Sequence, residues 1–468
     1  MTKTLVGPQL RQLRRAHNQT QADMARRLGV SASYVNLLEN NQRSLSVKIL
    51  LALTDSYGVA WQELINDNDV TQLADLRATF RDPIFTGDRP DLQELRAALD
   101  HAPRLVAQFM QLHQNYRAML GRLTHLDTQA AVPDMLATSA EAAIYEFFRQ
   151  HSNHFAQLEQ AADQARDAVG GQPDDIYANL KRHLVNAYGI EVELVTITSE
   201  SDTLRVFDEA RGRVLLSEAL DQVNRNFQLA YVLAMVTCSH LIETLIDAAE
   251  ALPEAARARC RVELSNYFAA AFLMPYTPFL SLAETSGYDI DRIAATFGVS
   301  FEMVCHRLTT LQRKGALGVP FFFLRIDRAG NVTKRFNATT FSLADKGGSC
   351  PVWNIHSAFA APGNIIPQFV ELPDAGQFFT ISRTTDRPVV SRHTQGRRLV
   401  VTLGCERAHA EQIGYARDLR VTDDANVAKI GINCHICPRQ ACSQRAHEPM
   451  HLNLSVDANR RGSTRYES

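Results

Sequence analysis

The chain has 468 residues, enough for about three domains, and its 45% hydrophobic content allows full-sized cores. No run of about 18 apolar residues is present, so no membrane-spanning helix is expected. The N-terminus lacks the apolar core of a secretory signal, so we expect a cytoplasmic protein. Its eight cysteines are then expected to be thiols or metal ligands rather than disulfides.

The first 66 residues differ in charge from the rest of the chain. They carry eight Lys/Arg and four Asp/Glu, a net charge of +4, whereas the whole chain has a net charge of −2. The remainder therefore has a net charge of −6. Positive charge is concentrated where phosphate contacts are expected.

Residues 20–45 predict two short helices that meet at a sharp turn. The first is expected over 21–28, followed by a turn at Gly29. Ser31 or Ser33 then caps a second helix that runs to about Asn40. The expected core between them consists of apolar residues at three- and four-residue spacings, namely Met24, Ala25, Leu28, Val35 and Leu38.

The outer face of the second helix is suited to the major groove of DNA. Amide and guanidinium groups beside it are placed to clamp phosphates. The predicted DNA-binding residues are Gln21, Ser31, Ala32, Ser33, Tyr34, Asn36, Asn40, Gln42 and Arg43. This pattern, with its trailing ENNQRSLS, closely resembles the helix-turn-helix of phage-repressor-like (XRE-type) regulators. An ordinary helical hairpin is the alternative.

Long helices are predicted after this domain, at 103–122 and 139–169. The second carries a stripe at alternating four- and three-residue spacings, formed by Ile144, Phe148, His151, Phe155, Leu158 and Ala162. Such a stripe suits a seam between two subunits, and packing against the chain's own domain explains it equally well.

A mixed segment follows, in which one helix, three strands and two apolar helices are expected. They are placed at 176–187, 191–198, 203–208, 213–217, 227–246 and 253–274. Residues 289–315 then have the pattern of a second helix-turn-helix.

The blocks FQLAYVLAM, ELSNYFAAAFLMP and IAATFGVSFEMVCHRL resemble the ImmA/IrrE metallopeptidase-like domain. Active members of that family carry H-E-x-x-H, in which two imidazoles bind zinc and the glutamate is the base. Here those positions hold Tyr231, Val232 and Met235, which cannot perform that chemistry. Glu263 matches the third ligand position, but one carboxylate does not hold a catalytic zinc. We expect a peptidase scaffold without its activity.

Residues 319–336 predict a hairpin of two strands around RAGN, which brings together Arg325, Arg328, Lys334 and Arg335. The alternating pattern beyond it predicts a β-rich domain. After His451 the chain is polar and is expected to be disordered.

A cysteine cluster lies in the last third of the chain, with C-x2-C-x4-C at Cys434, Cys437 and Cys442. Together with Cys405 from a preceding strand it makes a four-sulfur set suited to zinc or an iron–sulfur cluster. Cys350, which is followed by a proline, is the reserve fourth ligand. Unliganded buried thiols are the alternative.

These parts together resemble the short-chain fatty-acyl-CoA regulators, in their order and in GGxCPxWN with a closing C-x2-C-x4-C. The expected fold is multidomain α+β. Its parts are an all-α helix-turn-helix domain (1–66), a helical linker and oligomerisation region (67–170), a degenerate ImmA/IrrE-like α+β domain (171–318), a β-rich acyl-CoA-sensing domain with the cysteine cluster (319–450) and a tail (451–468).

The resemblance implies a transcription factor, not an enzyme, that senses an acyl-CoA such as propionyl-CoA or acetyl-CoA. Because a single helix-turn-helix offers few base contacts, we expect a homodimer or homotetramer on operator DNA. One branch of the family resembles iron–sulfur proteins in the cysteine region, which favours a 4Fe–4S cluster over zinc.

A CoA ester presents phosphates, an adenine and a thin apolar arm, so its site needs cations, aromatic surface and a narrow pocket. The predicted ligand residues are Arg325, Arg328, Lys334 and Arg335 of the hairpin, Arg307 and Arg313 before it, and Tyr267 and Phe268 at the acyl end. A solvated basic hairpin and two core aromatics are the alternative. Two other functions stay open: a metallopeptidase tethered to a DNA-binding domain, and a redox- or iron–sulfur-sensing regulator.

Overall fold

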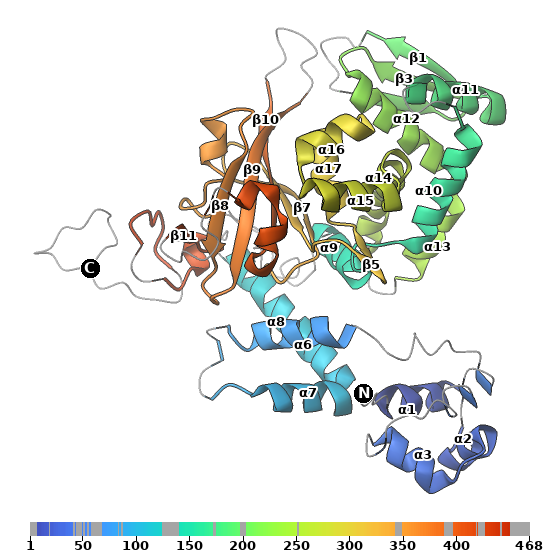
Figure 1. Ribbon diagram of the computed structural model, residues 1–468, viewed down its shortest axis with the longest axis vertical. Helices are drawn as coiled ribbons and strands as arrows, with labels where there is room; N and C mark the ends of the chain where they lie inside the picture. The colour runs from blue at the N-terminus through green and yellow to red at the C-terminus, as the bar shows by residue number, and fades with distance from the viewer. Residues whose placement is uncertain are drawn as a thin grey trace, which may run out of the picture. The chain divides into compact units, whose positions relative to one another are not determined.

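The structure is a computed structural model that divides into two compact units, Met1–Arg117 and Ala118–Ser468 (Figure 1). It describes residues 7–17, 19–40, 43, 49, 52–53, 56–57, 68–82, 84–85, 88–123, 140–171, 175–196, 203–249, 252–341, 349–387, 396–417, 419, 426–439 and 442–449. The predicted tail at 451–468 lies outside these ranges.

The first unit begins with the predicted helix-turn-helix, formed by α1 (Gly7–Ala16), α2 (Gln21–Leu28) and α3 (Ala32–Glu39). Thr20 caps α2 through a capping box with Asp23. Gly29 makes the turn at φ 65°, a left-handed conformation in which glycine has no steric penalty. Of the two serines considered as caps, Ser31 caps α3 by accepting a hydrogen bond from the Tyr34 N–H. The five predicted core residues are all buried.

Three further helices complete the first unit: α6 (Asn68–Thr79), α7 (Leu92–His101) and α8 (Pro103–Leu123), of which the last continues past the end of this unit at Arg117. Their core contains Leu76, Leu95 and Val106. Asp82 closes the bundle, since its carboxylate lies 3.0 Å from both His113 Nε2 and Arg117 Nη1. Burial would raise the pKa of Asp82, but these partners outweigh it and lower the pKa to about 2.

The second unit starts with α9 (Ala140–Gln150) and α10 (Ala156–Val169), where one long helix was predicted. The helix breaks at Ser152 and Asn153, which have φ values of 51° and 52°. Asn153 holds this turn by donating from Nδ2 to the Asn337 carbonyl at 2.9 Å. Phe148, Phe155 and the other apolar members of the predicted stripe are buried in the unit's own core, so of the two explanations of the stripe, packing against the chain's own domain is the one the structure shows.

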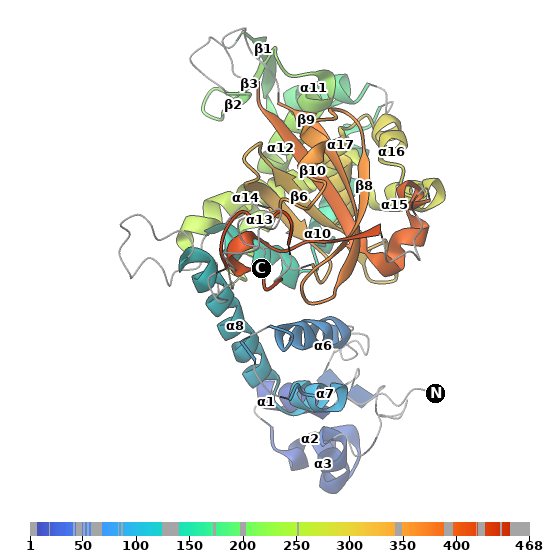
Figure 2. The ribbon, with the colours of Figure 1, turned by 90° about the vertical axis from the view of Figure 1, so that its left-hand side faces the viewer.

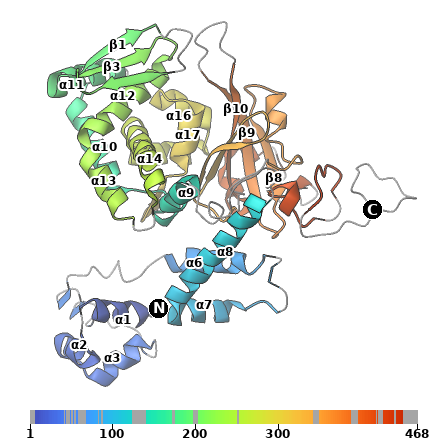
Figure 3. The same cartoon turned by 180° about the vertical axis from the view of Figure 1, so that it is seen from behind.

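The helical part of this unit is built around α14 (Glu254–Leu273), which α9, α10, α12 (Gln222–Thr237) and α13 (Ser239–Asp247) contact (Figure 3). Beside it, α11 (Ile176–Tyr188) precedes a three-stranded sheet of order β1-β3-β2: β1 (Glu191–Val195), β2 (Arg205–Asp208) and β3 (Arg213–Ser217). Among the described residues no single helix is long and apolar enough to cross a membrane. Only by length and composition could the two helices α12 and α13 together make one membrane span, and they are bent by 73° where they meet.

The chain continues through α15 (Tyr276–Ser286), α16 (Ile290–Phe297) and α17 (Phe301–Leu308) to the short β4 (Gln312–Arg313) and β5 (Ala316–Leu317). A six-stranded sheet of order β11-β8-β9-β10-β6-β7 follows, and its central strands run side by side in Figure 2. Its strands are β6 (Phe322–Ile326), β7 (Val332–Asn337), β8 (Ile366–Glu371), β9 (Gln377–Asp386), β10 (Arg398–Glu406) and β11 (Val427–Lys429).

The two faces of this sheet belong to different cores. Alternate residues of β10 show the division, because Val401 and Leu403 join the core shared with the helices and Val400 joins a second core. The second core also contains Cys350, Trp353 and other residues of the loops that cover this face. The fold is thus the predicted mixture of helical and β-rich parts.

Candidate functional site

The outer face of α3 is open to solvent. Ala32, Ser33 and Asn36 are exposed, and Leu37 is half-buried. Ser31 is occupied as the helix cap, and Tyr34 is half-buried against the helix-turn-helix core. Three side chains of the predicted reading face are therefore exposed where base edges of a major groove would lie, although the Asn36 Oδ1 already accepts from Asn40 and Gln21.

A buried carboxylate braces this reading helix. Glu39, 2% exposed, accepts from Arg14 at 2.6 and 3.0 Å and from Gln21 at 2.8 Å. Burial would raise the pKa of Glu39, but these hydrogen bonds outweigh it and lower the pKa below its ordinary value. The sequence prediction missed this role of Arg14 and Glu39, although Glu39 belongs to the repressor pattern. The Gln21 amide thus orients α2 against α3.

The remaining predicted phosphate contacts flank this brace. Asn40 accepts from Arg11 at 2.7 Å and donates to Asn36 at 2.9 Å, so these polar groups are fixed in orientation. Arg43 is exposed. Gln42 lies outside the described residues.

The second helix-turn-helix pattern is real in geometry but does not present a reading helix. Asp289 and Ser300 cap α16 and α17, and Gly298 makes the turn between them. However, Val304, Cys305 and the three residues after them are buried, and α17 packs on β10 of the six-stranded sheet. A helix covered in this way cannot enter a groove of DNA.

The positions that hold catalytic groups in peptidases are filled with packing and ion-pairing residues. Tyr231 carries the Arg205 guanidinium 3.8 Å from its ring centroid, and Val232 is fully buried. Glu263 lies 3.4 Å from Lys334 Nζ, so an ammonium group occupies the carboxylate. Within the described ranges, no group of three or more His, Cys, Asp or Glu side chains is arranged to hold a metal ion.

Cations of the sheet meet carboxylates of the helices in what we term the cation–carboxylate cluster. Arg325 Nη1 lies 2.6 Å from Glu302 Oε1, and Arg387 lies 3.4 Å from the same oxygen. The Lys334–Glu263 pair extends the cluster toward α14. Burial would raise the pKa of Glu302, but Arg387, Arg325 and Lys334 outweigh it and lower the pKa. The hairpin thus brings Arg325 and Lys334 together, as predicted from its register.

The other predicted cations are distributed differently. Arg328 is exposed at the turn between β6 and β7. Arg335 lies over the Tyr145 ring, 4.6 Å from its centroid, and Arg313 lies over Tyr276 at 3.9 Å. Of these three, only Arg328 is exposed at the surface; Arg313 and Arg335 are half-buried.

Arg307, Tyr267 and Phe268 belong to the core. The Arg307 guanidinium is fully buried and donates to both carboxylate oxygens of Glu159, at 2.6 and 2.8 Å. Tyr267 donates to the same carboxylate at 2.6 Å, and Phe268 is fully buried. Arg307 and Tyr267 donate hydrogen bonds to Glu159, and Phe268 is packed among apolar residues. All three therefore belong to the core and not to the predicted ligand surface.

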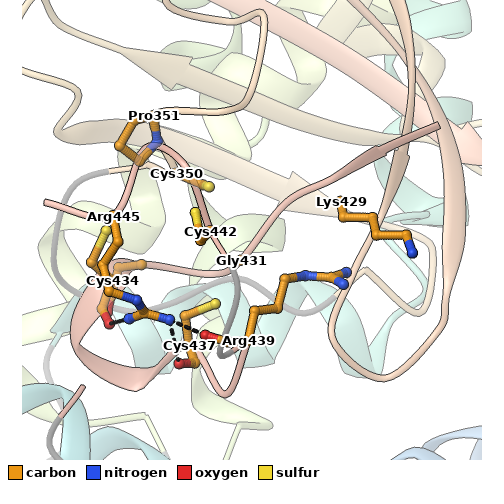
Figure 4. A pocket seen from close by; sticks show the side chains of 10 residues that line it. Cys350, Pro351, Lys429, Gly431, Cys434, Cys437, Arg439, Cys442 and Arg445 are labelled. Carbon is orange, nitrogen blue, oxygen red and sulfur yellow. Dashed lines mark hydrogen bonds between the residues drawn. The ribbon is translucent and has the colours of Figure 1, made fainter. Parts of the chain in front are cut away.

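Four cysteines line one pocket on the second core's side of the sheet (Figure 4). They are Cys350, Cys434, Cys437 and Cys442, together with the cations Lys429, Arg439 and Arg445. The pocket is therefore rich in both sulfur and positive charge, although its described thiols are not arranged to hold a metal ion.

The loop around this pocket is ordered by Arg445, which donates to the carbonyls of Cys434 at 3.1 Å and Cys437 at 3.4 Å. Gly431 lets the chain pass the Cys437 thiol, because a Cβ there would lie 2.6 Å from Sγ. Burial raises the pKa of the Cys350 thiol, while N–H groups of Gly431 and Val352 act against that rise. These donors are suited to a thiolate.

Cys405 does not line this pocket. It lies on β10 in the core shared with the helices, on the opposite face of the sheet from Cys350. Burial raises the pKa of its thiol to about 12. The structure thus brings the reserve ligand Cys350 to Cys434, Cys437 and Cys442, and places Cys405 elsewhere.

Comparison with known proteins is consistent with this architecture. A helix-turn-helix family matches residues 10–64, the IrrE N-terminal-like domain matches 185–309, and the short-chain fatty acyl coenzyme A regulator C-terminal family matches 310–466.

Two relatives are similar along the whole chain. The propionyl-CoA carboxylase regulator of Cereibacter sphaeroides is 37% identical over 466 residues, 99% of either chain. The HTH-type transcriptional regulator PrpR of Mycobacterium tuberculosis is 34% identical over 471 residues, covering all of this chain and 96% of the relative. A solved structure of a Mycobacterium tuberculosis transcriptional regulator, 35% identical, superposes in full on 71% of this chain with a TM-score of 0.67. The chain therefore belongs to the short-chain fatty acyl-CoA regulator family and is a DNA-binding transcriptional regulator.

Proposed function

We propose that this regulator controls propionyl-CoA or acetyl-CoA metabolism and that the acyl-CoA itself is its effector. The observation that carries the proposal is the cation–carboxylate cluster at the junction of the regulator-type sheet and the peptidase-like helices. Two relatives, named for propionyl-CoA carboxylase and as PrpR, support the choice of ligand. An ImmA/IrrE-type peptidase is the weaker candidate, because Tyr231 and Met235 replace the two zinc-binding imidazoles and Val232 replaces the glutamate base.

The cluster offers the ligand an exchange of partners. The phosphates of a CoA ester are polyanionic, and Arg325 and Lys334 are the cations best placed to receive them. Each of these cations is held by a helix carboxylate, Glu302 or Glu263. A phosphate that binds Arg325 would release Glu302 and with it α17, while Arg328 at the exposed hairpin turn would add a further cation.

This exchange provides the differential contact that regulation requires, since an effector shifts a conformational equilibrium only by its difference in affinity for the two states. A coupling of about 1–3 kcal/mol would change operator affinity about 5- to 150-fold. The acyl group would distinguish the effector from free CoA by the apolar contacts that it adds. Regulation in this form needs no catalytic step, and we propose that the protein is not an enzyme.

We further propose that the cysteine pocket holds one metal centre, with 4Fe–4S favoured over zinc. Four thiols and three cations line a single pocket, and this chemistry supports the proposal, although the described side chains are not arranged there to hold a metal ion. Cys350, Cys434, Cys437 and Cys442 would be the ligands. When bound, such a centre would cross-link the C-terminal loop to the sheet, and an iron–sulfur cluster would add a one-electron redox couple. Arg445 holds the loop carbonyls in place for ligation.

Titration calorimetry with propionyl-CoA, acetyl-CoA and free CoA tests the effector, and mass spectrometry of small molecules released from the purified protein tests it without a chosen ligand. The proposal predicts micromolar or tighter binding of a short acyl-CoA and weaker binding of CoA. A protein that binds none of the three and releases no CoA ester would leave the DNA-binding function standing and refute the sensor.

A further inference from the structure

Helix α8 carries an apolar edge that its own unit does not cover. Leu105 and Leu112 are 70% and 67% exposed, the two highest values among the large hydrophobic residues that the structure describes. They are seven residues apart, two helical turns, and so lie on nearly the same line along the helix. Isolated exposed leucines are ordinary, whereas two on one helical line indicate a contact surface.

The exposed leucines belong to a longer repeat. In the part of the helix whose side chains are described, apolar residues alternate at four- and three-residue spacings, as Leu105, Phe109, Leu112 and Tyr116. This is the spacing of a coiled-coil seam, sustained over nearly two heptads. One edge of the seam is already used, since Phe109 stacks on Phe80 with ring centroids 5.2 Å apart. The leucine edge is left for another partner.

We propose that α8 of two copies of this chain pairs in parallel about a two-fold axis, with Leu105 and Leu112 each facing its own counterpart. In the register of the repeat both leucines fall at the position where leucine favours two-stranded parallel coils. Only the consequence of this pairing for DNA binding rests on the expected oligomer on operator DNA.

Charge favours a second copy as the partner. Parallel pairing sets each side chain near its own counterpart, so a charged seam would repel itself. The residues exposed beside the leucines are uncharged, Gln108 and Asn115 among them. Of the charged residues on the part of α8 whose side chains are described, Arg117 is paired with Asp82 and Arg104 lies off the seam.

Pairing through α8 would bring two DNA-binding domains together. The part of α8 up to Arg117, which carries both leucines, belongs to the same compact unit as the reading helix α3, so joining two copies joins two DNA-binding units. A two-fold pair of this kind matches a pseudo-palindromic operator. The apolar members of the stripe on α9 and α10, for which a subunit seam was one of two explanations, are buried and cannot provide this contact.

The test compares full-length Leu105→Lys/Leu112→Lys with wild type by light scattering and operator gel shifts. A matched control, Ala107→Lys/Gln111→Lys, adds the same charge at exposed positions of the same helix away from the seam. The seam variant should have half the wild-type mass, unchanged thermal unfolding and a loss of operator affinity on the order of 100-fold. The control should behave as wild type.

Wild-type mass for the seam variant would overturn the proposal. A fall in its unfolding temperature at unchanged mass would show instead that the rest of the same chain covers the stripe. Because the mass measurement needs neither operator nor effector, its outcome is independent of the proposed function.

Cross-linking tests the orientation. Leu105→Cys alone and Leu112→Cys alone should each form disulfide dimers on mild oxidation, above the background of wild type. Cross-links that appear only when the two single variants are mixed would indicate antiparallel pairing and overturn the parallel arrangement.

Discussion

Replacing Glu302 by Gln should tighten acyl-CoA binding, although it removes an ion pair. Glu302 accepts from Arg325 at 2.6 Å and from Arg387 at 3.4 Å. A charge-assisted hydrogen bond contributes about 1.5–3 kcal/mol, and a phosphate that takes Arg325 must first break it. Because both partners are half-buried, we take the lower value. Without the competing carboxylate, the dissociation constant should fall roughly tenfold.

Calorimetry of propionyl-CoA binding to wild type and Glu302→Gln measures this effect. Glu243→Gln is the matched control, because Glu243 also pairs with an arginine, Arg261, but lies on α13, which contributes no residue to the cluster. Thermal unfolding of the ligand-free Glu302→Gln variant should move to lower temperature, since Arg325 and Arg387 lose their shared partner. Unchanged or weaker ligand binding by Glu302→Gln would refute the exchange of partners.

Three further outcomes are expected. Ser33→Ala with Asn36→Ala should weaken operator binding in gel shifts by about 1–3 kcal/mol per lost base contact, and an equal loss on random DNA would contradict the reading face. Cys350→Ala should lose the metal measured per chain after anaerobic purification while Cys405→Ala retains it; the reverse would return Cys405 to the ligand set. The pKa of buried Asp82 is lowered from 3.8 to about 2, so its contribution of about 2 kcal/mol is present above pH 4 and lost as the pH falls toward 2. Faster amide exchange in α6–α8 should report that loss, and acid-insensitive exchange would contradict it.

Local features of the fold could be predicted from the sequence, and long-range ones could not. The helix-turn-helix follows from neighbouring signals: apolar spacing, Ser31 as a cap and Gly29 in a left-handed turn. The break after α9 has no glycine or proline, and depends on Asn153 bonding to Asn337, 184 residues away. Local periodicity contains no information about such a contact.

The candidate sites show the same division. The hairpin register placed Arg325 beside Lys334, because pairing across a short turn is local. Arg307 was predicted on the ligand surface and is instead buried. Its carboxylate partner Glu159 lies 148 residues away in the sequence, so local patterns did not reveal the pair. Strand alternation puts Cys405 on one face of β10, but which face the cysteine loop covers is a property of the tertiary fold.

The most direct test of the account is operator affinity measured against acyl-CoA concentration. On wild-type protein at fixed salt, saturating propionyl-CoA or acetyl-CoA should change operator affinity about 5- to 150-fold, and free CoA should change it less. Arg325→Ala with Lys334→Ala should bind operator at the ligand-free wild-type level and lose that response. Operator affinity that is the same with and without every short acyl-CoA would contradict the central claim that ligand binding at the cluster controls DNA binding.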